Sequence, residues 1–207
     1  MIIAVDGPTA SGKGTIAKAL ASHFALPHLD TGLLYRAVGA QVAMAGGDPD
    51  READALAACN FAEALLADPA LRDEAAGALA SRVSVHPAVR RALYERQRAF
   101  ACQPGGAVID GRDIGTVIAP DADVKLFVTA SLEARAKRRW AEMQGRGQDV
   151  ALDAIAVDLA LRDARDSARA AAPSRAADDA IILDTSAMSA DEAIAAAIAI
   201  VTRTLSS

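Results

Sequence analysis

The segment GPTASGKGT near the start of the chain combines glycines, a lysine and hydroxyl side chains at a spacing that suits a phosphate chain. Glycines let the backbone curl with its N–H groups pointing inward, and a helix that begins just after them adds partial positive charge. Lys13 can reach the β- and γ-phosphates of a nucleotide as a point charge. The hydroxyl of Thr15 can serve Mg²⁺, because Gly14 occupies the usual hydroxyl position. We therefore expect nine residues to bind a nucleoside triphosphate: Gly7, Pro8, Thr9, Ala10, Ser11, Gly12, Lys13, Gly14 and Thr15.

The segments around this loop are the elements that such a phosphate site needs. Residues 2–5 (IIAV) form a β-branched run without alternation, typical of a strand buried on both faces, and residues 16–24 place apolar side chains at helical spacing. This setting argues against the alternative of a chance glycine-rich turn. Further strands are expected at 27–29, 107–109, 124–128 and 180–183, with helical segments between them. The pattern predicts an α/β protein of the P-loop NTPase type, with a parallel sheet of about five strands between two layers of helices.

Composition and charge exclude several classes of protein. The 207-residue chain has a net charge of −5, whereas a general nucleic-acid binder needs a basic surface. The longest apolar run, residues 193–201, is shorter than the ~18 residues of a membrane span, and the N-terminus has no basic leader. Cys59 and Cys102 have no metal-binding or disulfide spacing and are interpreted as reduced thiols. The expectation is a cytoplasmic monomer with no nucleic-acid or membrane partner.

Four further blocks of chemically active residues follow the loop along the chain: LDTG at 29–32 with YR at 35–36, VRRAL at 89–93 with RQRAF at 96–100, DGRDIGT at 110–116, and RDARDSAR at 162–169. In this order, and together with the GxxxxGKGT loop, these blocks resemble the bacterial cytidylate kinases, which belong to the nucleoside monophosphate kinases. The resemblance covers nearly the whole chain. It implies Mg²⁺-dependent, in-line transfer of the γ-phosphoryl group of ATP to CMP or dCMP, without a covalent intermediate.

The resemblance also implies roles for residues on the acceptor side. Arg36 and Arg112 would hold the acceptor phosphate, and Thr31, Arg90 and Asp113 would face the cytosine. Asp113 has an independent logic, since a carboxylate accepts a hydrogen bond from the cytosine N4 amine but would face a carbonyl in uracil. The expected parts are a single kinase domain at 1–207 with an acceptor-binding helical insertion at about 36–100 and a lid at about 145–175.

The arginine-rich block at 162–169 is expected to form part of that lid. The resemblance implies that Arg162 and Asp166 hold the ribose hydroxyls and that Arg169 bridges the phosphates of both substrates. Positions 162, 166 and 169 would share one helical face, and the alternative is ordinary i,i+4 pairing of Asp158, Arg162 and Asp166. The expected catalytic residues are Lys13, Arg112, Arg162 and Arg169.

The chemistry of the acceptor agrees with a site rich in arginine and poor in bases. A phosphate monoester has a second pKa of about 6, so the acceptor is already a dianion at neutral pH and needs no general base. The histidines, His23, His28 and His86, accordingly lie in no catalytic pattern. Asp110, at a strand end, is a second candidate for contacting Mg²⁺ through water, and the alternative for Asp110 and Asp113 is a turn cap.

Residues 60–85 depart from the family pattern. The longer bacterial members have a strand-rich insertion there with a hydroxyl that touches the base, whereas this segment is short and helical, and Asp68 is only a positional counterpart. Three other interpretations stay open: a different small-molecule P-loop kinase, a nucleotide-dependent switch, and an ATP-binding assembly or transport subunit. A guanine-reading N-K-x-D motif is absent, because the one asparagine is Asn60.

Overall fold

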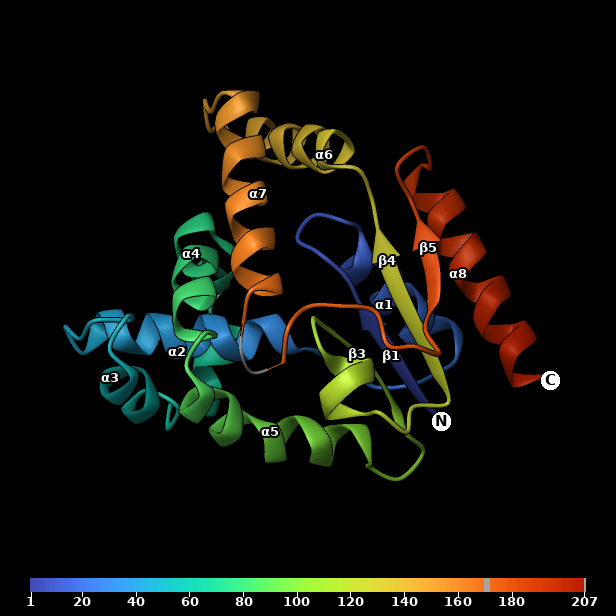
Figure 1. Ribbon diagram of the computed structural model, residues 1–207, viewed down its shortest axis with the longest axis horizontal. Helices are drawn as coiled ribbons and strands as arrows, with labels where there is room; N and C mark the ends of the chain where they lie inside the picture. The colour runs from blue at the N-terminus through green and yellow to red at the C-terminus, as the bar shows by residue number, and fades with distance from the viewer. Residues whose placement is uncertain (170–171, 207) are drawn as a thin grey trace. The chain divides into compact units, whose positions relative to one another are not determined.

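The β-branched runs of the sequence assemble into one five-stranded sheet of order β2-β3-β1-β4-β5 (Figure 1). The central strand β1 runs parallel to β3 and β4, with Ile3 opposite both Val108 and Val124. The computed structural model describes residues 1–169 and 172–206. The predicted α/β fold with a parallel sheet of about five strands is therefore confirmed. The strands are β1 (Ile2–Asp6), β2 (His28–Asp30), β3 (Ala107–Gly111), β4 (Val124–Thr129) and β5 (Ile181–Asp184).

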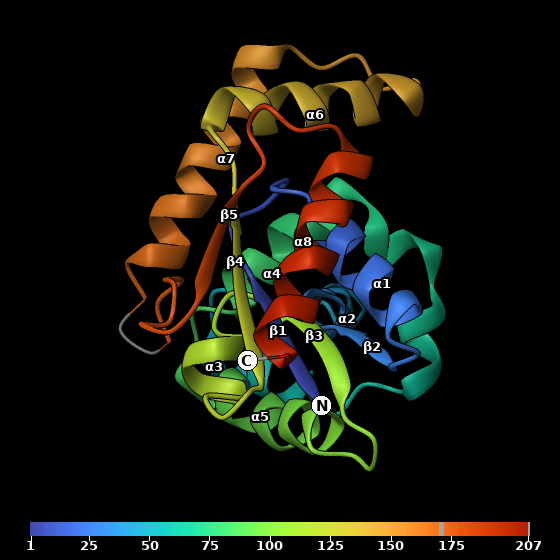
Figure 2. The ribbon, with the colours of Figure 1, turned by 90° about the vertical axis from the view of Figure 1, so that its right-hand side faces the viewer.

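Helices cover the sheet because its three central strands, β1, β3 and β4, are apolar and largely buried. The helices α1 (Lys13–His23) and α8 (Ala190–Leu205) pack against each other and against the sheet (Figure 2). Their buried side chains, among them Leu20 and Val201, join strand residues such as Val5 in one hydrophobic core. A single turn of π-helix, η3 (Ile114–Ile118), packs against β1 and β3.

The chain divides into two compact units, and the first consists of Met1–Leu29 together with Ala101–Ser207. Besides the sheet, this unit contains the two long helices α6 (Leu132–Gly145) and α7 (Leu152–Ser167), which share a small apolar core. Ala10 of the phosphate loop packs against that core. Across residues 1–169 and 172–206, no helix is long and apolar enough to cross a membrane.

The second unit, Asp30–Phe100, is helical. Its core gathers Leu34 and Val38 with Leu71 and Val89. The alanine-rich stretch 48–86, part of the insertion expected to be helical, consists of several short helices, and Pro69 begins one of them. The helices of this unit are α2 (Thr31–Met44), α3 (Glu52–Ala57), η1 (Glu63–Ala67), η2 (Pro69–Arg72), α4 (Glu74–Val83) and α5 (Pro87–Ala101).

Candidate active site

The phosphate loop, residues 7–15, joins the end of β1 to the start of α1. Gly7 has a φ of 150°, and an added Cβ would lie 2.0 Å from the carbonyl oxygen of Val128, so glycine alone fits there. Gly12 caps α1 with a φ of 90°. Ala10 has a φ of 61°, a conformation that costs a non-glycine residue on the order of 1 kcal/mol. The loop is therefore held in its bent shape by its surroundings.

The polar groups at the start of α1 suit a phosphate and its metal ion. Lys13 begins the helix and folds its amine back over the loop, while Thr15 is exposed on the same first turn. An added Cβ on Gly14 would lie 3.8 Å from Oδ2 of Asp110, so this strand-end carboxylate neighbours the loop. The other carboxylate oxygen of Asp110 lies 2.7 Å from Nε2 of His28, a residue that the sequence did not associate with the site.

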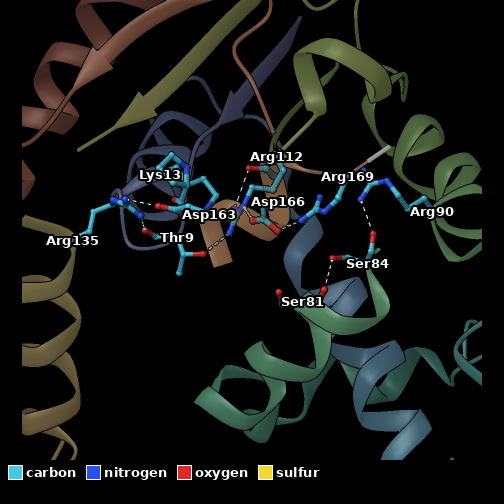
Figure 3. Close-up of polar contacts among 12 residues, drawn as sticks. Thr9, Lys13, Ser81, Ser84, Arg90, Arg112, Arg135, Asp163, Asp166 and Arg169 are labelled. Atoms are coloured by element: carbon cyan, nitrogen blue, oxygen red, sulfur yellow. Dashed lines mark hydrogen bonds and ion pairs between the residues drawn. The ribbon is translucent and has the colours of Figure 1, made fainter. Parts of the chain in front are cut away.

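Arg112, in the turn after β3, contacts both the phosphate loop and α7 (Figure 3). Its Nη2 donates to Oγ1 of Thr9 at 2.6 Å, and its Nε donates to Oδ2 of Asp166 at 2.8 Å. Asp166 also pairs with Arg169. Burial alone would raise the pKa of Asp166, but the charges of the two guanidinium groups hold that pKa below its usual range. The first unit thus brings together residues that lie far apart in the sequence and that were all assigned to the site.

The end of α7 differs from the prediction. The helix stops at Ser167, so Arg169 lies beyond it and reaches Asp166 from the following segment. The prediction that Arg162, Asp166 and Arg169 share one helical face is therefore wrong for Arg169. The carbonyl of Asp166, in the last turn of the helix, accepts the N–H of Ser174 at 3.0 Å. Arg162 is buried and its Nε lies 2.8 Å from Asp158, the i,i+4 pairing considered above.

Arg135 of α6 is a site residue that the sequence did not single out. Its side chain is only 6% exposed. Its Nη1 donates to the carbonyl of Thr9 at 3.2 Å, and its Nη2 donates to Asp163 of α7 at 2.6 Å. A buried guanidinium therefore ties α7 to the phosphate loop (Figure 3). In the sequence it is one of several basic residues in EARAKRRW, and nothing there distinguishes it from the exposed Lys137.

Asp6, the last residue of β1, was also missed. It is 4% exposed, and its two oxygens accept the backbone N–H groups of Ile114 and Gly115 at 2.9 and 2.8 Å. Burial raises the pKa of Asp6 to about 6, although the two N–H groups act in the opposite direction. Its position, at a strand end directly before Gly7, is the signal that could have found it.

Along the chain, Asp113 lies between Arg112 and the two residues, Ile114 and Gly115, whose N–H groups donate to Asp6. It is 5% exposed, and its carbonyl accepts the N–H of Val117 at 2.9 Å, which starts the turn of η3. Its carboxylate is thus on a tightly held backbone in the first unit.

The remaining predicted acceptor residues lie in the second unit. Thr31 is buried at the start of α2, and Arg36 of the same helix donates its Nη1 to the carbonyls of Leu71 and Asp73 at 2.8 and 3.0 Å. Asp68, the positional counterpart named above, caps η2 by accepting the N–H of Ala70. These contacts place Arg36 against carbonyl oxygens, the neutral counterpart of a phosphate oxygen.

Arg90 of α5 is buried within the second unit. Its Nη1 lies 3.4 Å from the carbonyl of Ser84 (Figure 3), and its guanidinium carbon lies 5.5 Å from the ring centroid of Tyr35. Stacking on an aromatic ring orients the plane of a guanidinium group. Tyr35 therefore helps to fix the orientation of the Arg90 side chain.

The central strand of the parallel sheet leads into a glycine-rich phosphate loop, which contacts the partly exposed Arg112 and the buried Arg135. These features define a nucleotide-binding protein of the P-loop class. A family model described as cytidylate kinase matches residues 3–203. A cytidylate kinase of Xanthobacter autotrophicus is 58% identical over 201 residues, which cover 97% of each chain. A cytidylate kinase of a Methylobacterium species is 60% identical over 181 residues, covering 87% of this chain and 86% of the relative. The chain belongs to the cytidylate kinase family.

A solved structure of an uncharacterized protein from Eubacterium ventriosum is similar to this chain. The TM-score is 0.55, the alignment covers 100% of this chain and 99% of the other, and the sequences are 16% identical. At that identity the similarity concerns the fold, and it supports the P-loop α/β architecture.

Proposed function

We propose that in this protein the residues gathered at the phosphate loop carry out the reaction of the cytidylate kinase family. The protein is an ATP-dependent kinase that transfers the γ-phosphoryl group to CMP or dCMP and releases ADP with CDP or dCDP. The observation that carries the residue assignment is the cluster of Arg112, Asp166 and Arg169 against Thr9 of the loop. Phosphoryl transfer needs little covalent chemistry from the protein, so positioning and positive charge do most of the catalysis.

The donor half of the site binds ATP through the loop residues 7–15. Lys13 and the inward N–H groups hold the β- and γ-phosphates. The oxygen donors nearby fit Mg²⁺, which would be held by the hydroxyl of Thr15 and the carboxylate of Asp110, directly or through water. Mg²⁺ in kinase sites is commonly bound through one or two protein groups together with the phosphates of the nucleotide. When bound, Mg²⁺ supplies neutralisation of the phosphate charge.

The arginines provide the charge that brings two polyanions into line. Arg112 holds the acceptor phosphate, and Arg169 bridges the phosphates of the two substrates. Arg162 and Asp166 hold the ribose hydroxyls. The ion pairs of Asp166 support these roles, because an anionic side chain already gathers both guanidinium groups beside the loop.

The acceptor residues select cytosine. Arg36 holds the acceptor phosphate in place of the two carbonyls that it now contacts. Arg90 and Thr31 face the base, and the buried carboxylate of Asp113 accepts the N4 amine of cytosine. With uracil a carbonyl would face this carboxylate, and an unpaired buried polar group costs about 1–3 kcal/mol.

ADP release from Mg·ATP tests the proposal, with CMP, dCMP, UMP, AMP and GMP each offered as acceptor. We expect fast turnover with CMP and dCMP, lost in Lys13→Ala and retained in Lys18→Ala, an exposed position further along α1. If UMP is phosphorylated as well as CMP while Lys13→Ala is inactive, the protein is a P-loop kinase but Asp113 does not select cytosine. If no acceptor raises ADP release, the kinase assignment itself is wrong.

We further propose that the protein acts as a cytoplasmic monomer on small-molecule substrates and does not bind nucleic acid. The net charge of −5 supports the last point, because it repels a phosphate backbone except at local arginines. Sedimentation velocity at two protein concentrations, with and without an oligonucleotide, tests both: a concentration-dependent sedimentation coefficient or co-sedimentation with the oligonucleotide would contradict them.

A further inference from the structure

Asp6 links two parts of the nucleotide chemistry within the first unit. It is the last residue before Gly7, so its backbone starts the phosphate loop, and its side chain holds the backbone just after Asp113. We propose that Asp6 is a positioning residue whose carboxylate fixes the turn that carries Arg112 and Asp113 and thereby sets recognition of the acceptor. This inference rests on the roles proposed above for Arg112 and Asp113.

The contact requires a carboxylate. Two N–H donors, from Ile114 and Gly115, converge on the side chain, and each of its oxygens accepts one of them. An asparagine has one acceptor oxygen, so its amide N–H₂ would face the second backbone N–H. Asp6 is 4% exposed, so water cannot readily replace the lost acceptor.

The turn held by Asp6 has an uncommon shape. Residues 114–118 form a π-helical turn in which Ile118 donates to the carbonyl of Asp113 and Ala119 donates to the carbonyl of Ile114. Such turns are rare and occur frequently at functional sites. The turn is also packed closely, since an added Cβ on Gly115 would lie 3.2 Å from the stem of Lys125 and 3.5 Å from Oδ2 of Asp6. The backbone after Asp113 is thus held by the hydrogen bonds of Asp6 and by close packing.

The charged groups facing Asp6 are Asp113, Arg112 and Lys125. Burial has the largest effect on the pKa of Asp6 and raises it; the charge of Asp113 also raises this pKa, and the charge of Arg112 lowers it. The Lys125 stem lies across Gly115, and its amine is paired with Asp179 at 2.7 Å. Arg112 and Asp113 are residues proposed to bind the acceptor. A substitution at Asp6 should therefore change the position and the electrostatic environment of acceptor-binding residues.

The variant Asp6→Asn tests the inference through acceptor selectivity. We expect the ratio of kcat/KM for CMP to that for UMP to fall about tenfold and KM for CMP to rise, while KM for ATP stays within about twofold of wild type. The matched control is Asp123→Asn, because Asp123 accepts the N–H of Ile2 at the opposite end of β1 at 2.7 Å. Unchanged selectivity, or an equal rise in KM for ATP and CMP, would overturn the proposal.

A second measurement uses the wild-type enzyme and does not depend on the variant folding. The amide resonances of Ile114 and Gly115, followed by NMR from pH 5 to 8, should move together with a midpoint at about 6, the pKa of Asp6. Two resonances that do not titrate would refute the contact. If Asp113→Ala leaves the CMP to UMP ratio unchanged, base reading by Asp113 has failed. In that case the positioning role of Asp6 is tested by these two resonances and by the KM for CMP of Asp6→Asn.

Discussion

Replacing Asp6 should make the stability of the protein depend differently on pH. Because burial raises the pKa of Asp6 from 3.8 to about 6, its protonated form is favoured in the folded state. The stability that this group contributes is therefore complete below its unfolded pKa and is lost as the pH rises through the folded pKa. At about 1.4 kcal/mol for each tenfold change in acidity, the rise in the pKa of Asp6 to about 6 corresponds to roughly 3 kcal/mol, of which about half is lost between pH 5 and 8.

Asp6→Asn has no titrating group at this position, so its free energy of unfolding should lack this pH-dependent loss. Relative to wild type, the variant should gain roughly 1–2 kcal/mol between pH 5 and 8. Urea unfolding of both proteins at each pH, followed by circular dichroism, measures the difference, and other titrating groups cancel in the comparison. Asp123→Asn should show no such trend. A difference that is constant over this range, or that moves in favour of wild type as the pH rises, would refute the reasoning.

Three further substitutions test other parts of the site. Asp166→Asn should lower stability above about pH 4 and have little effect in acid, because the lowered pKa of Asp166 contributes stability only when the group is ionised; chemical unfolding at both pH values checks this. Arg135→Met should destabilise by about 2 kcal/mol, and a double-mutant cycle with Asp163→Leu should recover part of the loss. Gly7→Ala should abolish ATP binding, measured by calorimetry, and lower the melting temperature more than Gly46→Ala, where an added Cβ meets nothing within 4 Å.

The sheet and the phosphate loop could be predicted because their signals are local. A β-branched run before a glycine-rich segment specifies strand and loop within about a dozen residues. The assignments of Arg112 and Asp166 came from the family resemblance, and the structure brings these two residues within 2.8 Å of each other. Neither spacing nor composition could have given that distance, since 54 positions separate them along the chain.

The residues that sequence analysis missed are those whose partners are distant. Arg135 contacts a loop residue 126 positions away, and Asp6 contacts Ile114 across 108 positions. Such contacts determine whether a charged side chain is buried. The local sequence around an acidic residue at the end of a strand is the same whether its carboxylate contacts water or two backbone amides. The end of α7 was missed for a related reason. The N–H of Ser174, a residue outside the helix, donates to the carbonyl of Asp166 in its last turn.

The ion pairs of Asp166 have a consequence for how the site discriminates among anions. With its carboxylate in place, Arg112 and Arg169 already have a resident counter-ion, so the loop does not present two bare cations to chloride or free phosphate. In the roles proposed above, the phosphates of a nucleotide compete with this carboxylate for the N–H donors of both arginines. The carboxylate remains attached to the protein, so a bound nucleotide adds its own negative charge to the site. We therefore expect an anion that contacts both arginines at once to bind in preference to chloride or free phosphate.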